Sequence, residues 1–278
     1  MPDLEDIPVS ELFVEIDFAE LQAAKLRLGK LLPDVKSSHR CEAFARGLGY
    51  RAYASLLAAV RSQPIAAHAD GAAFAGYLLE HGFGAGAATL YRVLARLAIA
   101  RVLVSTPCLS HWGIGAGAPQ LKADRTWETA SEKHERFQEE RRTLAQAEDE
   151  FLLSLSFLSR IEPTATIRPG AGSYRLKHLA ESSTCEYPGG ATFGPRYVAN
   201  GSMIAAAIHL GFRYRAAFDH LGYEVPNVEF NMSKSMIDDL DCRLRPGGGL
   251  AADRRHKLQR RQGRSHLQNW QLALGALA

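Results

Sequence analysis

Three stretches decide the fold: TATIRPGAGSYRLKHLAE (164–181), RYVANGSMIAAAIHLGFRYR (196–215) and PNVEFNMSKS (226–235). Short alternating or β-branched runs in and beside them predict strands at TATIR, YVAN, FRYRAAF and VEFNMS. Between these runs, SYRLKHLAE is predicted to be a helix with Ser173 as its N-cap. MIAAAIHLGF is a second helix, with Asn200, Gly201 and Ser202 as its turn and cap. The mixture of strands and helices predicts an α/β part with a small sheet over residues 163–240.

The chain before Pro163 is predicted to be helical. Apolar residues recur at helical spacing from Asp17 to Leu32, and Pro33 ends the pattern. A second helix runs through CEAFARGLGY with Ser37 or Ser38 as its N-cap, and YASLLAAV forms a third. The pattern then predicts a linker at SQPIAAHADG, helices at AAFAGYLLEHGF and ATLYRVLARLAIARVLVS, a surface loop at WGIGAGAP, and one long helix over about 127–160.

Taken together, these patterns predict an α+β protein that is predominantly helical. An N-terminal helical module is followed by a mixed α/β C-terminal part with a small sheet. The expected domains are a small helical module (1–62), a helical region with the long helix (63–162), a mixed α/β domain (163–240), and a glycine hinge with a basic tail (241–278).

Composition indicates an ordinary globular protein. Of the 278 residues, 46% are hydrophobic and 23% charged, which is far from the composition of a disordered chain. No apolar run reaches the roughly 18 residues that a membrane helix requires, and the N-terminus is acidic where a signal peptide would be basic. We therefore expect a cytoplasmic protein with no membrane association. The four cysteines are widely spaced, which favours scattered buried thiols.

Charge is distributed unevenly along the chain, although the net charge is only +3. Residues 1–36 contain eight acids and four bases, whereas residues 243–266 contain eight bases and one acid. A basic segment of this kind has affinity for phosphates without sequence specificity, and a solvated tail explains it equally well. The candidate binding residues of the tail are Arg254, Arg255, Lys257, Arg260 and Arg261.

The predicted helix SYRLKHLAE carries a second group of candidates. With Leu176, Leu179 and Ala180 turned inward, its outer face would hold Arg175, Lys177, His178 and Glu181. Glu181 lies four residues after Lys177 and three after His178, so both can pair with it along the helix. The group is either an ordinary surface pair or a cationic patch in which Glu181 orients His178 toward a phosphate or an acidic partner.

Alternation in FRYRAAF places Arg213 and Arg215 on one face of a strand beside aromatic residues, a combination that suits nucleic acid. An ordinary exposed strand face explains it as well. Lys234 adds a further base, whereas His209 is interpreted as a packed or surface histidine. The sequence contains no HExxH, P-loop or nucleophile-elbow motif. We accordingly predict no catalytic residue, no metal and no cofactor. The sequence favours a binding protein over an enzyme.

Two family resemblances add context. VKSSHRCEAFARGLGYRAYASLLAAV (35–60) resembles a small helical module named as glyoxalase-related, through Ser38, His39, Glu42, Ala45, Gly49, Tyr50, Tyr53 and Leu56. The chain has no glyoxalase metal ligands, so this name implies no activity here. Residues 70–237 resemble a family carried on plasmids and integrative conjugative elements of proteobacteria, through EPTATIRPGAGSYRLKHLAE, YVANGSMIAAAIHLGF and PNVEFNMSKSMI. That resemblance implies a mobile-element context and no particular activity. The EYPGGATFGP insertion and the basic tail depart from its pattern.

These observations lead to three hypotheses. The first is a mobile-element accessory protein that binds nucleic acid without catalysis through a basic C-terminal surface. The second is a protein-binding inhibitor or adaptor that acts on a host defence or conjugation protein through the acidic N-terminus and the charged segment 127–150. The third is an enzyme that processes nucleotides or nucleic acid, which would need His178, Glu181, Lys177 and Lys234 to converge in space.

Overall fold

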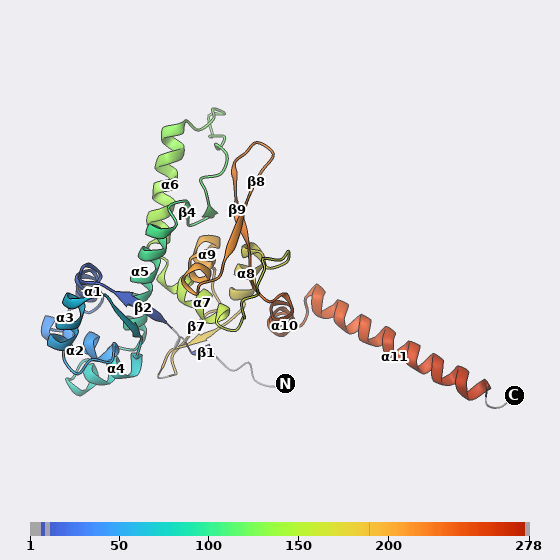
Figure 1. Ribbon diagram of the computed structural model, residues 1–278, viewed down its shortest axis with the longest axis horizontal. Helices are drawn as coiled ribbons and strands as arrows, with labels where there is room; N and C mark the ends of the chain where they lie inside the picture. The colour runs from blue at the N-terminus through green and yellow to red at the C-terminus, as the bar shows by residue number, and fades with distance from the viewer. Residues whose placement is uncertain (1–6, 9–11, 189, 276–278) are drawn as a thin grey trace. The chain divides into compact units, whose positions relative to one another are not determined.

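The structure is a computed structural model that describes residues 7–8, 12–188 and 190–275, with side chains for residues 12–188 and 190–262. It has a predominantly helical α+β fold with small sheets, as the sequence predicts (Figure 1). The chain divides into two compact units, residues 1–233 (unit 1) and residues 234–278 (unit 2). This division differs from the expected boundaries at residues 62, 162 and 240.

Unit 1 begins with a helical layer closed by a pair of strands. Its helices are α1 (Phe18–Leu31), α2 (Ser37–Gly47), α3 (Tyr53–Ser62) and α4 (Gly71–Glu80). Asp17 caps α1 through a reciprocal capping box with Glu20. The segment predicted as a linker contains strand β3 (Ile65–His68), which pairs antiparallel with β2 (Phe13–Ile16). Because β3 completes this pair and α4 packs on α2, the N-terminal layer continues beyond residue 62.

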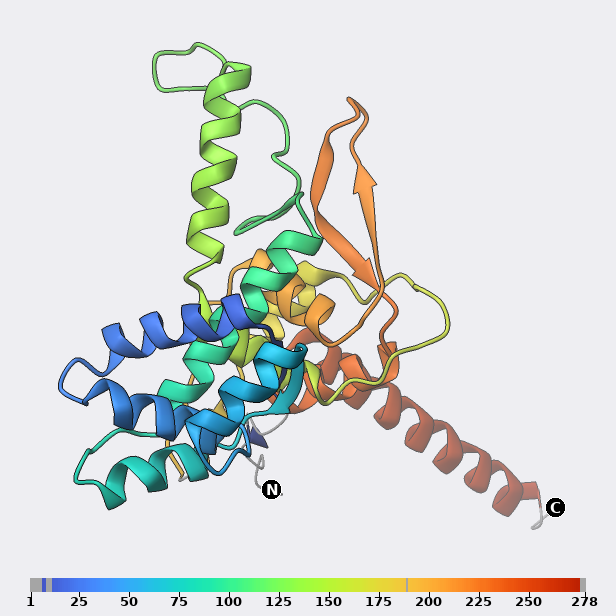
Figure 2. The same cartoon turned by 60° about the vertical axis from the view of Figure 1, so that its left-hand side comes forward.

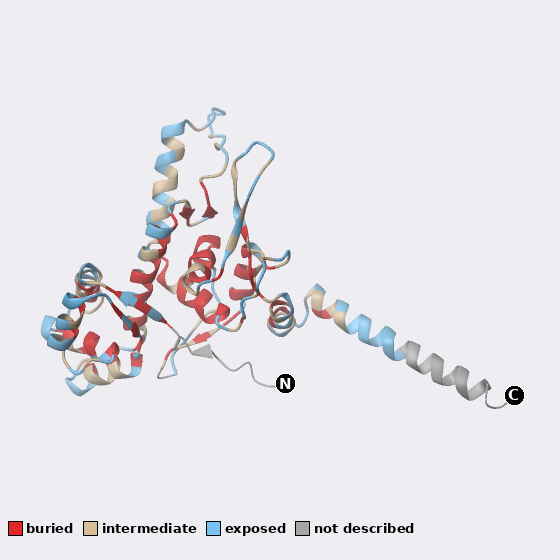
Figure 3. Cartoon of the chain, in the orientation of Figure 1, coloured by how far each residue is buried: buried red, intermediate tan, exposed pale blue. Residues whose placement is uncertain are grey.

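Helix α5 (Ala88–Ser105) lies at the centre of unit 1. It packs against α1, α4, α7 and α9, and its buried side chains occur around most of its circumference. The buried residues concentrate in α5, α7 (Glu148–Leu158), α8 (Ser173–Ala180) and α9 (Asn200–His209) (Figure 3). These four helices form the core on which the candidate site is built.

The long helix expected over 127–160 is two helices. Helix α6 (Ala130–Leu144) is largely exposed, whereas every residue of α7 from Phe151 to Leu158 is buried. The chain turns at residues 145–147, where Ala147 becomes the N-cap of α7. The physical reason for the break is the change in composition, since the charged half stays in solvent while the apolar half must enter the core. Figure 2 shows α6 projecting from the body of unit 1, on the side from which strands β8 and β9 also extend.

Two of the four predicted runs form strands. β8 (Tyr214–Phe218) and β9 (Glu224–Phe230) pair antiparallel, with Tyr214 opposite Phe230 and a register shift between Ala216 and Ala217. TATIR forms no strand, and YVAN leads directly into α9. Instead, the Thr164 amide donates to the Asn231 carbonyl, just after β9, at 2.7 Å, and Val198 is buried before α9. The other strands are β1 (Ile7–Pro8), β4 (Leu109–Ser110), β5 (Gly113–Ile114), β6 (Cys185–Glu186) and β7 (Thr192–Phe193).

The predicted helix caps are wrong by one position or more. Lys36, Gly172 and Ala199 are the N-caps of α2, α8 and α9, and none of them makes a side-chain capping bond. Ser173 is instead buried in the first turn of α8, where its hydroxyl accepts a hydrogen bond from the Val228 amide at 3.1 Å. Here a polar side chain that could have capped the helix locally forms a hydrogen bond with a distant part of the chain instead.

WGIGAGAP is packed against β9 and is not a surface loop. Gly113 and Gly115 are buried and have φ angles of 133° and 78°, which favour glycine. A Cβ at Gly113 would lie 2.1 Å from the carbonyl oxygen of Pro226, so only glycine allows this approach of the β4–β5 turn to β9.

Unit 2 consists of α10 (Lys234–Leu244) and α11 (Gly249–Gly275). Gly247 and Gly248 separate the two helices, and the segment expected to be a basic tail is helical through residue 275. Arg254 of α11 pairs with Asp239 of α10 at 2.7 Å. Within the described residues of both units, no helix is long and apolar enough to cross a membrane.

Candidate functional site

The structure separates the predicted binding residues into three groups. Arg175, Lys177 and His178 lie on α8, Arg213 and Arg215 lie at β8, and Lys234 and the basic residues of the tail lie in unit 2. The first two groups belong to unit 1 and the third belongs to unit 2, so the prediction of a basic C-terminal surface is taken up group by group. Each group has its own geometry.

Lys177 was expected on the outer face of α8, but it is buried, with 7% of its surface exposed. Its ammonium pairs with the Glu181 carboxylate at 3.1 Å. It also lies over the rings of Tyr174 and Tyr197, at 5.3 and 5.1 Å from their centroids. These aromatic faces and the carboxylate hold the charge away from water, so Lys177 is not available to a nucleic-acid backbone.

His178 and Glu181 form the pair that their spacing predicts. Nδ1 of His178 lies 2.6 Å from one carboxylate oxygen of Glu181, and the other oxygen accepts from Lys177 and from the Val198 amide at 3.2 Å. Burial raises the pKa of Glu181, but the hydrogen bonds from His178, Val198 and Lys177 outweigh it and leave the pKa below its ordinary value. Glu181 is therefore a carboxylate at neutral pH that fixes the orientation of the His178 ring.

A shallow depression of about 460 Å³ opens beside this pair. It is lined by Lys177, His178, Glu181, Pro195, Arg196 and Tyr197. The last three belong to the loop before α9, within or directly after the EYPGGATFGP insertion, and the sequence gives no sign that this loop meets α8. The depression brings together donors from two elements and lies entirely within unit 1.

Three consecutive acids at the start of α7 hold the loop and the neighbouring helices in place. Glu148 accepts from Arg27 of α1 at 2.8 Å and from Arg96 of α5 at 3.4 Å. Glu150 accepts from the Ala199 amide at 2.8 Å and from the Ser202 hydroxyl at 2.9 Å, which satisfies the N-terminus of α9.

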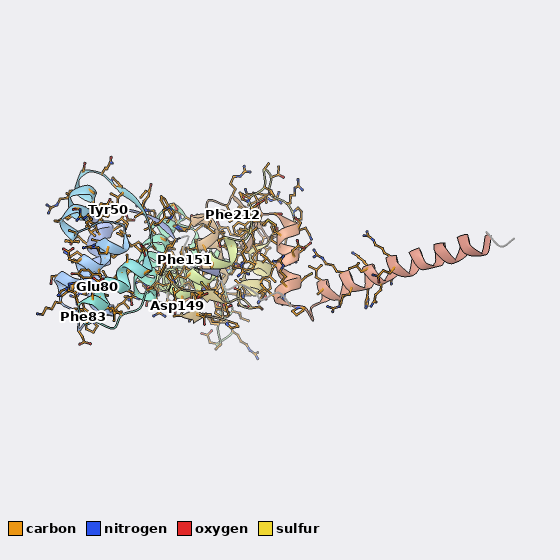
Figure 4. The ribbon with its side chains drawn as sticks, turned by 90° about the horizontal axis from the view of Figure 1, so that it is seen from below. Tyr50, Glu80, Phe83, Asp149, Phe151 and Phe212 are labelled. Carbon is orange, nitrogen blue, oxygen red and sulfur yellow. The ribbon has the colours of Figure 1, made fainter. Side chains whose placement is uncertain are left out.

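Asp149, the middle acid, accepts two hydrogen bonds from Arg92 at 2.7 and 3.0 Å and one from Arg196 at 2.7 Å. Burial raises its pKa, but the two arginines prevail and the net shift is downward. Figure 4 labels Asp149 and the buried Phe151 of the same helix. Sequence analysis missed these acids, although their position between the charged and apolar halves of 127–160 was a usable signal.

The arginines at β8 are exposed, as the alternation predicts. Arg213 donates a side-chain hydrogen bond to the Ala165 carbonyl, and its amide donates to the Asn231 side chain at 2.6 Å. Arg215 lies opposite Glu229 in the strand pair, so its cross-strand neighbour is an acidic residue. Arg175, on α8, is partly buried.

Unit 2 has the strongest concentration of positive charge. Lys234 pairs with Asp238 at 2.6 Å on α10, and Arg255 donates to the Pro246 carbonyl at 2.7 Å. Lys257, Arg260 and Arg261 are exposed. Residues 254–262 contain five bases and no acid.

Protonation of Glu181 should cost stability in acid. Because its folded pKa lies below the ordinary value of 4.5, its contribution is present above that value and is lost as the pH falls through the folded pKa. We expect Glu181→Gln to flatten the loss of unfolding free energy between about pH 6 and pH 3. Urea unfolding across this range measures the effect, with Glu139→Gln on exposed α6 as the control that leaves the slope unchanged. Parallel curves for wild type and Glu181→Gln would contradict this role.

No protein-family model, curated protein or solved structure matches the chain. Within the described residues, no group of three or more His, Cys, Asp or Glu side chains could hold a metal ion. The geometry of the three groups is therefore the basis for a proposal about function.

Proposed function

We propose that the protein binds nucleic acid without catalysis, through the basic face of α11. The observation that supports this proposal is the run of bases on an exposed helix. The exposed Lys257, Arg260 and Arg261 are spaced by three and four residues and therefore share one face of α11. Arg255, also exposed, adds a fourth base to this helix, whereas Arg254 is paired with Asp239. A row of cations along a helix is complementary to the phosphates of a nucleic-acid backbone.

The binding is expected to be independent of sequence. Phosphate contacts fix the position of a protein on nucleic acid but read no bases, and the proposed face consists of arginine and lysine. The exposed Arg213 and Arg215 are proposed as a second, weaker contact in unit 1. Lys177 and Lys234 are removed from the contact set, since both are engaged in ion pairs. The mobile-element context rests on the family resemblance alone and stays a prediction.

The alternative of a protein-binding adaptor rests on the acidic N-terminus and on the charges of α6. Much of the acidic N-terminus, including Asp3, Glu5 and Asp6, lies outside the described residues. The charges of α6 are largely used within their own segment, where Arg136 pairs with Glu128 at 2.8 Å and with Glu140 at 2.9 Å. The enzymatic alternative has an oriented histidine in His178, whose Nδ1 bonds to a carboxylate and not to a nucleophile.

Neutralising the α11 face should weaken binding to labelled duplex DNA and to RNA. We expect the quadruple variant Arg255→Gln, Lys257→Gln, Arg260→Gln, Arg261→Gln to reduce the slope of log affinity against log salt by roughly 3 to 4. Titrations between about 50 and 200 mM salt measure the slope.

The matched control replaces four exposed arginines of unit 1, Arg46, Arg51, Arg61 and Arg125, with glutamine and therefore makes the same change in net charge. It should leave the slope close to that of the wild type. An equal loss in the control would show that only net charge matters, and absence of wild-type binding at low salt would overturn the proposal.

A further inference from the structure

We propose that the depression beside α8 is a binding site for the phosphate group of a small molecule, with His178 as its pH-dependent donor. This site is separate from the proposed nucleic-acid function, because its residues all belong to unit 1 and none belongs to α11.

Glu181 already has hydrogen-bond donors within the protein for both of its carboxylate oxygens. One oxygen accepts from Lys177 and from the Val198 amide, and the other accepts from His178 Nδ1. A carboxylate with three donors has little capacity left for a ligand, and its charge is balanced by the buried Lys177. The negative charge at the base of the depression therefore does not exclude an anion.

The His178 ring is oriented by its hydrogen bond with Glu181. Since Glu181 is a carboxylate, the proton on the His178 ring resides on Nδ1, and Nε2 is the nitrogen that remains for a ligand. The ring meets Tyr174 edge-on at 4.6 Å, which holds it in place, and 38% of the side chain is exposed. When His178 becomes protonated, Nε2 becomes a charged donor directed by a fixed ring.

Where Arg196 meets Asp149, positive charge exceeds negative charge. Asp149 is bound by Arg92 through two hydrogen bonds and by Arg196 through one, so two guanidinium groups share one carboxylate. Arg196 lines both this depression and the neighbouring one that contains Asp149. It uses Nη1 for the contact with Asp149, and a guanidinium has five N–H groups. It can therefore bind a second oxyanion while it keeps its place on Asp149.

The remaining polar group of the lining is also a donor. Burial raises the pKa of Tyr197, as do the nearby Glu150, Glu181 and Tyr174, so its phenol keeps its proton. Glu150 is directed to the N-terminus of α9, where it accepts from Ala199 and Ser202. Once His178 is protonated, the depression offers an imidazolium, a guanidinium and a phenol. A phosphate group, which only accepts and carries up to two charges, is complementary to this set.

The test uses the full-length chain with isotope-labelled histidine and inorganic phosphate as the probe, at constant ionic strength set with chloride. We expect phosphate to shift the ring resonances of His178 in a saturable way, because a bound anion favours the charged ring. His178→Asn identifies the resonance and should weaken phosphate binding at least tenfold at acidic pH. His134→Asn, which removes an exposed histidine on α6, is the matched control and should leave binding unchanged.

A second variant tests the guanidinium. Arg196→Gln leaves Asp149 its two bonds from Arg92, so the fold should persist while phosphate affinity falls at least tenfold. Three outcomes would overturn the proposal: a shift that fails to saturate, an equal shift at every histidine, or equally tight binding of acetate. Loss of nucleic-acid binding on mutation of α11 would have no bearing on these results.

Discussion

Gly201→Ala should destabilise unit 1 by about 4 kcal/mol, as overpacking against rigid backbone and loss of hydrogen bonds combine. A Cβ at this position of α9 would lie 1.9 Å from the Ser110 carbonyl oxygen and 2.8 Å from the His111 carbonyl oxygen. Neither contact can be relieved by rotation of a side chain. The Gly201 amide also donates to His111 at 2.9 Å, so displacement of the β4–β5 turn breaks this bond as well.

Urea unfolding measures the change in free energy, with Gly76→Ala as the control. Gly76 is also a helical glycine, in α4, but a Cβ there would meet nothing within 4 Å. Alanine has the higher helix propensity, so this control should stabilise by up to about 1 kcal/mol. If both variants had similar stability, the close contact between α9 and the β4–β5 turn would be refuted.

Glu148→Ala is expected to cost about 3 kcal/mol, the low end of the range for removing one partner of a buried ion pair. Glu148 is 6% exposed and joins α7 to Arg27 of α1 and to Arg96 of α5. Its removal leaves two guanidinium groups beside the core without their carboxylate. Because about a third of each arginine side chain reaches solvent, water compensates part of the loss.

Glu139→Ala is the matched control for this variant, since Glu139 pairs with Arg142 on α6 and both side chains are about two-thirds exposed. Exposed pairs of this kind contribute roughly 0 to 1 kcal/mol. The comparison of the two glutamate variants by urea unfolding separates the effect of burial from that of charge. Equal losses would show that the row of acids on α7 does not connect the helices of unit 1.

The local sequence pattern predicted helices and strands correctly wherever the surroundings of a segment stay the same along its whole length. The helix from Asp17 onward and the apolar helix α5 are confirmed, because each buries one set of residues throughout its length. Strand β8 is confirmed as a strand, although none of its residues is buried. Predictions were wrong where the environment changes within a segment. The long helix divides at residues 145–147, and β3 lies in an expected linker because a strand pair needs a distant partner that local sequence does not reveal.

The candidate site shows the same division. Helical spacing correctly predicted that Lys177 and His178 would both pair with Glu181. It did not predict that Lys177 is buried, since its depth depends on Tyr197, twenty residues later in the chain. The meeting of Arg196 with Asp149 joins residues 47 positions apart, and no local rule anticipates such a contact.

What the sequence by itself determined is the α+β, mainly helical character of the chain, the pairing partners along α8 and the basic character of α11, because all of these follow from residue spacing of four or fewer and from composition. Only the tertiary structure decided which charges are exposed. Lys177 is enclosed by two tyrosine rings, whereas Lys257, Arg260 and Arg261 are exposed to solvent. The physical reason is that burial of a charge depends on the distant groups packed around it, which the local pattern does not encode.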